Sequence, residues 1–238
     1  MTTVLLVRHG RTTANDAGVL AGWTEGVGLD ETGQAQVRAL AGRLAAVPLA
    51  AVVTSPLQRC QETTALLLEG REVPVHPDDR LGEVRYGEWS GRELKKLAKE
   101  PLWKVVQSHP SAMTFPGEDG ESMRAMANRA VDAVRDWNAR LASDKKEAVY
   151  AVVSHGDVVK AILADALGMH LDQFQRLVVD PGSVSIVSYT PLRPFVLRVN
   201  DVGGDLSFLA PRKGTRRRRK PPSSEASLGG GLGAADSA

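Results

Sequence analysis

Short apolar runs alternate along this chain with longer stretches in which apolar residues recur at helical spacing. The runs Thr3–Val7, Ala50–Ser55 and Ala148–Ser154 are rich in β-branched residues and lack an alternating polar pattern, which is typical of strands buried on both faces. The helical spacing predicts one helix over 30–47 and another over 59–69. Strands that alternate with helices favour one α/β domain with a mostly parallel sheet.

The rest of the chain continues this alternation, with one interruption. Residues 85–122 contain three prolines and several glycines, so we expect irregular structure there around a short helix near 93–100. The other elements that the pattern predicts are a short strand at 73–76, a long helix from Met123 to Leu141, a helix at 158–167 and a closing hairpin formed by "SVSIVSY" and "FVLRVN".

The composition is that of a globular protein, with 42% hydrophobic and 24% charged residues among 238. No apolar run approaches the roughly 18 residues that span a bilayer, and the first residues lack the basic segment of a secretory signal. The single cysteine, Cys60, cannot form an internal disulfide, which fits a reducing compartment. We therefore expect a cytoplasmic protein without membrane contact, and the Ala, Gly and Arg content suggests a bacterial source.

Positive charge is concentrated near the C-terminal end of the sequence. Residues 211–238 hold seven basic and two acidic residues, so the rest of the chain has a net charge of −3 although the whole carries +2. This segment lacks apolar periodicity, and we expect a disordered basic tail after a domain that spans 1–210. Clustered basic residues attract polyanions, but no aromatic residues are interleaved with them. We expect at most nonspecific contacts with nucleic acid.

Candidate chemistry follows directly after each of the three apolar runs. Arg8 and His9 follow the first run, Arg59 begins the helix after the second, and His155 and Gly156 follow the third. Because ligands bind at the carboxyl ends of parallel strands, we expect these side chains to converge. Arginine binds phosphate oxygens in a bidentate manner, and helix N-termini add backbone N–H donors. The combination predicts a phosphoryl site.

Histidine in such a site predicts covalent catalysis. Neighbouring arginines disfavour protonation of His9, which leaves a neutral ring that can attack phosphorus and form a phosphohistidine. His155 would stabilise charge on the equatorial oxygens. The leaving alkoxide needs a proton, for which Glu83 is the candidate acid and Glu88 the alternative. No arginine follows Cys60 closely enough to form the loop of a cysteine phosphatase, so we expect a small buried side chain there.

Six motifs appear together in this order: "VRHGRTTAN", "AGWTEGVGLDETG", "TSPLQRCQET", "LGEVRYGEWSG", "PGEDGES" and "VVSHGDVVKAIL". Over roughly residues 1–200 the chain thereby resembles the histidine phosphatase superfamily, the phosphoglycerate mutase-like proteins. The resemblance implies a three-layer α/β/α sandwich with a mostly parallel central sheet. It also implies that the insertion at about 85–122 forms a lid over the pocket.

The resemblance implies a role for each candidate residue. His9 matches the phosphorylated nucleophile and Glu83 matches the proton donor. Neither a metal ion nor a cofactor is implied, and the five histidines show no metal-ligand spacing. The residues that the resemblance places in the phosphate pocket or along the substrate phosphate are Arg8, Asn15, Ala21, Gly22, Arg59, His155 and Gly156.

The family includes phosphatases and mutases, and two features favour a phosphatase. Mutases typically have an arginine directly after the acidic residue and a longer insertion with paired arginines, whereas Val84 follows Glu83 here. The segment "FPGEDGES" resembles the Pro-Gly-Gly-Glu-Ser element of the phosphatase branch, with an insertion. We therefore expect metal-independent hydrolysis of a small phosphomonoester. The alternatives are a cofactor-dependent phosphoglycerate mutase, with Arg85 replacing the missing arginine, and an inactive relative that binds phosphorylated ligands.

Two further interpretations stay open from the sequence. Tyr86, Trp103, Met113 and Phe115 either face an apolar part of the substrate or pack the lid on the body. The closing hairpin has an edge that could pair with a second copy in a homodimer. The identity of the phosphomonoester is set by the lid, and one sequence does not reveal it.

Overall fold

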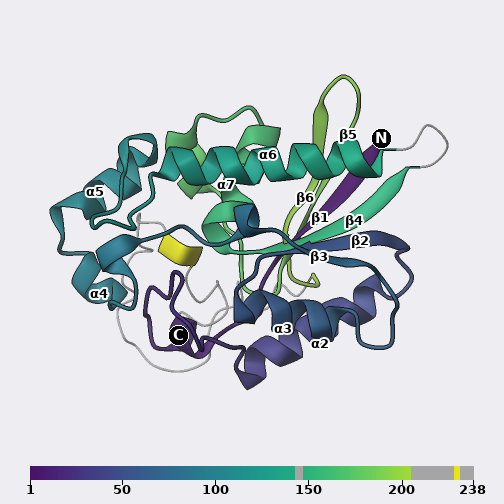
Figure 1. Cartoon of the computed structure of the whole chain (residues 1–238), viewed down its shortest axis with the longest axis horizontal. Coiled ribbons are helices and arrows are strands. Elements are labelled where there is room, and N and C mark those ends of the chain that lie inside the picture. Colours follow the sequence, from purple (N-terminus) through teal and green to yellow (C-terminus); the bar gives the residue numbers. More distant parts are fainter. Residues whose placement is uncertain (143–146, 205–227, 231–238) are drawn as a thin grey trace, which may run out of the picture.

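The apolar runs of the sequence form parallel strands at the centre of one mixed sheet (Figure 1). The computed structural model describes residues 1–142, 147–204 and 228–230. In these residues the strands are β1 (Thr2–Arg8), β2 (Leu49–Thr54), β3 (Val75–Pro77), β4 (Ala148–Ser154), β5 (Val184–Tyr189) and β6 (Pro194–Asp201). Their order in the sheet is β3-β2-β4-β1-β5-β6, and β5 runs antiparallel to both of its neighbours.

Helices cover both faces of this sheet. The α-helices are α1 (Thr13–Asp16), α2 (Glu31–Leu44), α3 (Gln58–Leu67), α4 (Leu94–Leu97), α5 (Pro101–Ser108), α6 (Met123–Leu141) and α7 (Gly156–Ala166). α2 and α3 pack on one face of the sheet in a cluster with Val7 and Val153, whereas α6 and α7 pack on the other face with Val4 and Val152. The alternation of side chains along each strand supplies both clusters. The predicted α/β/α sandwich is confirmed.

The insertion contains more helix than its sequence pattern predicts. The pattern gives one short helix near 93–100, whereas the structure has α4 and then α5 in this region. α5 begins at Pro101, a position where the missing N–H of proline has no helical partner to lose. It buries Trp103 and Val106 against the body, so tertiary packing stabilises a helix of only eight residues.

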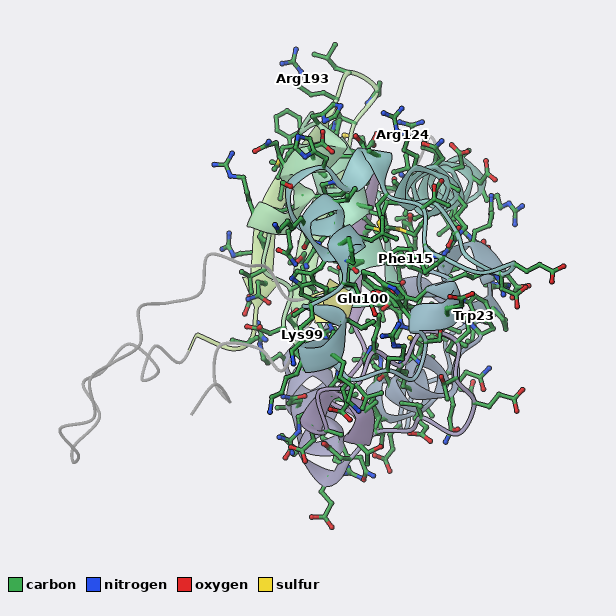
Figure 2. The ribbon with its side chains drawn as sticks, turned by 90° about the vertical axis from the view of Figure 1, so that its left-hand side faces the viewer. Trp23, Lys99, Glu100, Phe115, Arg124 and Arg193 are labelled. Carbon is green, nitrogen blue, oxygen red and sulfur yellow. The ribbon has the colours of Figure 1, made fainter. Side chains whose placement is uncertain are left out.

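The apolar side chains of the insertion pack with one another. The rings of Tyr86 and Phe115 lie edge to face with centres 4.9 Å apart, and Trp89 contacts both Phe115 and Trp103. Tyr86, Phe115 and Met113 are at most 2% exposed. Figure 2 shows Phe115 toward the interior of the molecule. Of the two interpretations, the structure favours the one in which these side chains pack the lid on the body.

The closing hairpin is present as β5 and β6, and Arg193 projects at its tip (Figure 2). β6 forms one edge of the sheet, and Phe195 and Leu197 on it are each half exposed. The expected homodimer through this edge stays a prediction.

Of the segment 211–238, the structure describes three residues. Its basic cluster, Arg212–Lys220, lies outside the described residues. Leu228–Gly230, however, form a short 3-10 turn, η6, and Leu228 is buried in the same apolar cluster as α6 and α7. Leu228 is thus one apolar side chain of this segment that packs on the body.

The first turn of α2 holds the loop that follows β1. The Asp30 carboxylate accepts the N–H of Gly33 and also pairs with Arg11. A Cβ on Gly33 would overlap the backbone of Arg11, and a Cβ on Gly10 would lie 2.6 Å from the carbonyl oxygen of Gly33. Glycine at both positions lets the helix approach the loop directly. Gly42, on the same helix, has open space at its Cβ position.

We predict that Gly33→Ala lowers stability by about 1–3 kcal/mol or more, because two backbone segments must separate. Gly42→Ala is the matched control, and it should raise stability by about 0.5–1 kcal/mol because alanine favours an open helix position. Denaturant unfolding of both variants measures the difference. Equal effects of the two substitutions would show that α2 and the loop can separate enough to accommodate a methyl group at no cost in stability.

Candidate active site

The carboxyl ends of β1 and β4 meet at the centre of the sheet and bring two histidines together. Arg8 pairs opposite Ser154, so His9 and His155 leave the sheet at the same level. The chain continues from β1 toward the face covered by α2 and from β4 directly into α7 on the opposite face. Ligands bind where connections diverge in this way. The two imidazole rings lie edge to face with their centres 5.3 Å apart.

His9 is held in one tautomer. Its Nδ1 lies 2.8 Å from the carbonyl oxygen of Gly10, which can only accept, so Nδ1 carries the proton of the neutral ring. The lone pair is then on Nε2. Burial, and after it the charges of Arg59 and Arg8, hold the pKa of His9 well below its usual range. The structure therefore presents a neutral imidazole with a lone pair at Nε2.

His155 is also neutral and packs against β2 and α3. The hydroxyl of Ser55 lies 2.7 Å from its Nε2, and the sulfur of Cys60 lies 3.5 Å from the same atom. Burial, followed by the charge of Arg59, lowers the pKa of His155 well below its usual range. Burial raises the pKa of Cys60 to about 12, so its thiol stays protonated. Cys60 is the small buried side chain that the sequence predicts.

Two buried arginines supply positive charge beside the histidines. Arg8 ends β1, and its Nη1 donates to the carbonyl of Val179 at 2.8 Å. Burial lowers the pKa of Arg8 to about 10, so it remains a cation at neutral pH. Arg59, in the first turn of α3, donates from Nη2 to the carbonyl of Gly22 at 2.9 Å. Both arginines depress the pKa of both histidines, which places the four side chains in one site.

Glu83 is a buried carboxyl of this site. Its Oε2 lies 4.0 Å from Nδ1 of His155, and its Oε1 accepts the N–H of Val84. Because His155 is neutral, this contact is not an ion pair. Burial and then the charge of Asp157 raise the pKa of Glu83 to about 7, against the opposing effect of Arg59. Glu88, the alternative acid, is exposed, and the structure favours Glu83.

Four other residues were predicted to belong to the site, and each has a different environment. Gly22 is in contact through its carbonyl with Arg59, and it has a left-handed backbone, with φ of 53°. Gly156 is buried and begins α7, for which His155 is the N-cap. Ala21 is half-buried beside Gly22. Asn15 accepts the N–H of Thr12, the N-cap of α1, through its Oδ1 and so completes a capping box.

Sequence reasoning missed Arg129, which fixes the backbone around Glu83. From α6 it donates to the carbonyls of Arg80 and Gly82, both at 2.7 Å, and to the carbonyl of Glu83 at 2.9 Å. Its other donors form a bidentate pair with Glu121 at 2.7 and 2.8 Å. An arginine on an amphipathic helix is ordinarily a solvated residue. The one feature of the sequence that could have pointed to Arg129 is its position eight residues after Glu121, the glutamate of the "GES" motif.

A second missed feature is a buried polar network next to Glu83. Asp157 accepts the hydroxyl of Tyr86 at 3.0 Å, and its other oxygen lies 3.3 Å from Nζ of Lys160. Asp157 is fully buried, and its charge is the largest charge effect that raises the pKa of Glu83. The sequence placed Tyr86 in the lid but gave no sign that its hydroxyl reaches α7.

In residues 1–142, 147–204 and 228–230, no group of three or more His, Cys, Asp or Glu side chains is arranged to hold a metal ion. None of the helices in the same ranges is both long enough and apolar enough to cross a membrane.

The sequence from residue 4 to residue 202 matches the histidine phosphatase superfamily (branch 1). The chain belongs to this superfamily. The resemblance drawn from the six motifs is confirmed, and in this histidine phosphatase superfamily member His9 and His155 lie together at the carboxyl ends of β1 and β4.

Relatives of the chain include both phosphatases and a mutase. It is 29% identical over 184 residues to 2,3-bisphosphoglycerate-dependent phosphoglycerate mutase 2 of Gloeobacter violaceus, which covers 76% of this chain and 82% of the relative. It is 28% identical over 208 residues to phosphoserine phosphatase 1 of Hydrogenobacter thermophilus, covering 84% and 92%. Among solved structures, YhfR of Bacillus stearothermophilus superposes with a TM-score of 0.76 at 29% identity, over 84% of this chain and 98% of that chain.

The raised pKa of Glu83 predicts how stability depends on pH. The folded state holds this proton more tightly than the unfolded state, in which the pKa is about 4.5, so stability is full below pH 4.5 and falls as the pH rises to about 7. Glu83→Gln cannot ionise and should be more stable than the parent by up to about 3 kcal/mol at pH 8, with little difference at pH 4.

Unfolding curves at pH 4, 6 and 8 measure this difference. Glu88→Gln removes an exposed carboxyl five residues away and should leave the pH dependence unchanged. If the stability difference between Glu83→Gln and the parent were the same at all three pH values, Glu83 would ionise in the folded protein as it does in the unfolded chain.

Proposed function

We propose that this chain hydrolyses a phosphomonoester of a small metabolite through a phosphohistidine on His9. The observation that carries the proposal is the environment of His9. A neutral imidazole, with its lone pair on Nε2, lies among two buried arginines, a second neutral histidine and a protonated carboxyl. Relatives that act on phosphorylated metabolites support the choice of substrate class.

The charges of the site suit a phosphoryl dianion. Asp157 and Lys160 are neighbours of opposite charge, and His9 and Glu83 are neutral in the state that reacts. Arg8 and Arg59 then leave a charge of about +2 that a phosphate ester with two negative charges would neutralise. In a buried site these interactions are stronger than in water, so they favour the anion over neutral ligands.

In the proposed reaction, groups of this chain accept and release both the proton and the phosphoryl group. Nε2 of His9 attacks phosphorus, the bond from phosphorus to the leaving oxygen breaks, and Glu83 gives its proton to the leaving alkoxide. The Glu83 carboxylate then takes a proton from water as the water oxygen bonds to phosphorus, and the bond from phosphorus to Nε2 of His9 breaks, with its electron pair returning to Nε2. Phosphate leaves, and His9 and Glu83 return to their starting states. Arg8, Arg59 and His155 stabilise charge on the phosphoryl oxygens in both transition states.

The surroundings of Glu83 support water over a second substrate as the acceptor. Val84, in the position where mutases typically have arginine, is fully buried. Arg85 is exposed, and its guanidinium lies 4.1 Å from the centre of the Trp23 ring. Trp23 in turn donates to the carbonyl of Glu83. The cation that could replace the mutase arginine is thus engaged with a ring, and hydrolysis is the activity that we infer.

His9→Ala should abolish phosphate release, with a loss of at least about 10³-fold in kcat, because the imidazole that attacks phosphorus in the proposed reaction is lost. Purified protein is assayed with a chelator present, on an aryl phosphate and a panel of phosphomonoesters. His109→Ala changes an exposed histidine and serves as the control. A parallel assay follows interconversion of 3- and 2-phosphoglycerate with the bisphosphate primer.

The outcomes separate the three alternatives. Release that depends on His9 without interconversion supports the phosphatase, and interconversion would instead identify a mutase. Folded parent protein that is silent in both assays but binds inorganic phosphate would identify an inactive ligand-binding relative.

Arg129 should act as a positioning residue for Glu83, and the leaving group distinguishes this role from a general structural one. Arg129→Lys keeps the charge but loses the planar fork that holds three carbonyls. We expect kcat to fall about 10- to 100-fold for an alkyl phosphate, which needs the proton of Glu83, and much less for p-nitrophenyl phosphate, which does not. Glu83→Gln should show the same pattern more strongly.

Arg135→Lys, on the exposed face of the same helix, is the matched control. Activity of the parent toward the alkyl phosphate should fall above pH 7, and this fall should be absent in Glu83→Gln. Equal losses for both substrates in Arg129→Lys would show that Arg129 stabilises the fold alone.

A further inference from the structure

A groove with a volume of about 450 Å³ lies between α6 and the C-terminal half of α7. These two helices lie side by side on one face of the sheet (Figure 1). The residues that line the groove do not include those of the candidate active site. Small-molecule sites have volumes of roughly 300–1,000 Å³, so the groove is large enough to hold a ligand of its own.

The groove is elongated and follows α6. The side chains that α6 contributes recur at three- and four-residue spacing from Arg124 to Arg135, a stripe about 16 Å long at the helical rise of about 1.5 Å per residue. The floor includes Val131 of α6 and Ala161 and Ala164 of α7, which are at most 9% exposed. Small side chains on facing helices leave room between them, and the space is narrow and apolar. Its shape suits a linear alkyl chain.

One end of the groove has an arginine that can take an anion. Arg124 lies at the surface (Figure 2), and its Nε donates to the carbonyl of Ser111 in the 3-10 turn η3 (Pro110–Ala112) at 2.6 Å. Within the described residues, no hydrogen bond or ion pair engages its two terminal nitrogens. The acid at this end, Asp172, accepts the N–H of Ser111 at 2.8 Å and lies 3.3 Å from Nδ1 of His170. The open fork of Arg124 matches the two oxygens of a carboxylate.

The other end of the groove carries the opposite charge. Arg135 lies between two acids there, 3.0 Å from Asp165 and 3.8 Å from Asp132. Two carboxylates and one guanidinium leave one net negative charge. An anionic head group is therefore repelled from this end and attracted to Arg124, which favours a single orientation for a ligand with one charged end.

We propose that the groove between α6 and α7 binds a medium-chain carboxylate, with its carboxylate on Arg124 and its alkyl chain along the alanine-lined floor. Charge complementarity places the head group, and the small buried side chains accommodate the chain. The length of the groove limits the length of the chain that fits. The proposal does not depend on the proposed function, because binding is measured without turnover.

Calorimetry of the full-length protein with hexanoate and octanoate, both below the concentrations at which they form micelles, tests the proposal. Octanoate should bind about tenfold more tightly than hexanoate, because two more methylene groups leave water. Acetate has the head group without the chain, and octylammonium has the chain with the opposite charge. Neither should bind measurably.

Two variants, each with a matched control, locate the site. Arg124→Ala should weaken octanoate binding about 3- to 10-fold, whereas Arg38→Ala removes an exposed arginine from α2 and should not. Ala127→Leu fills part of the groove and should weaken binding about tenfold or more. Ala139→Leu places the same side chain at an exposed position of α6 and should have no effect. Circular dichroism and the thermal midpoint establish that each variant is folded.

The proposal would be overturned if folded parent protein did not bind octanoate, if octylammonium bound equally well, or if both variants bound octanoate as their controls do. Excess inorganic phosphate should leave octanoate binding unchanged. Competition by phosphate would instead place the carboxylate on the arginines of the active site and would also overturn the proposal. None of these outcomes bears on phosphate release, so the failure of this proposal is distinguishable from the failure of the proposed function.

Discussion

Backbone pairing between β1 and β4 runs in unbroken register from Thr2 opposite Ala148 to Arg8 opposite Ser154. The register fixes the level at which His9 and His155 leave the sheet, and a shift of one residue in either strand would turn the side chains of that strand to the wrong face. Hydrogen bonds continue past the strands, since the N–H of His9 donates to the carbonyl of Ser154. The central position of this pair, with strands on both sides, buries the site and gives it a rigid base.

Burial determines the protonation states of the side chains at the ends of these strands. It is the first cause of the low pKa of both histidines, of the raised pKa of Glu83 and of the lowered pKa of Arg8. The charges of the arginines and of Asp157 then add to or oppose this effect. Two neutral imidazoles and a carboxylic acid beside two cations are costly to keep in a fold, and pKa shifts of this kind are typical of functional sites.

The sequence predicted what depends on local patterns and on the general rules of α/β sheets. The apolar runs identified the central strands, and the residues after each run identified Arg8, His9, Arg59 and His155, because parallel strands end at a common edge. Arg129 could not be found in this way, since its five hydrogen bonds depend on how α6 lies over the segment around Glu83. The docking of Leu228 was hidden for the same reason: it depends on an apolar site assembled from distant segments, within a stretch whose composition indicates disorder.

Enclosure and access make opposite demands on this site. His9 stays neutral and Glu83 stays protonated only while water is excluded, so a permanently open pocket would lose the states that the chemistry needs. A permanently closed pocket would admit no substrate. The two demands are compatible if access comes from movement of the segments above the sheet and not of the sheet itself, because the β1–β4 register then holds His9 and His155 in place while substrate enters.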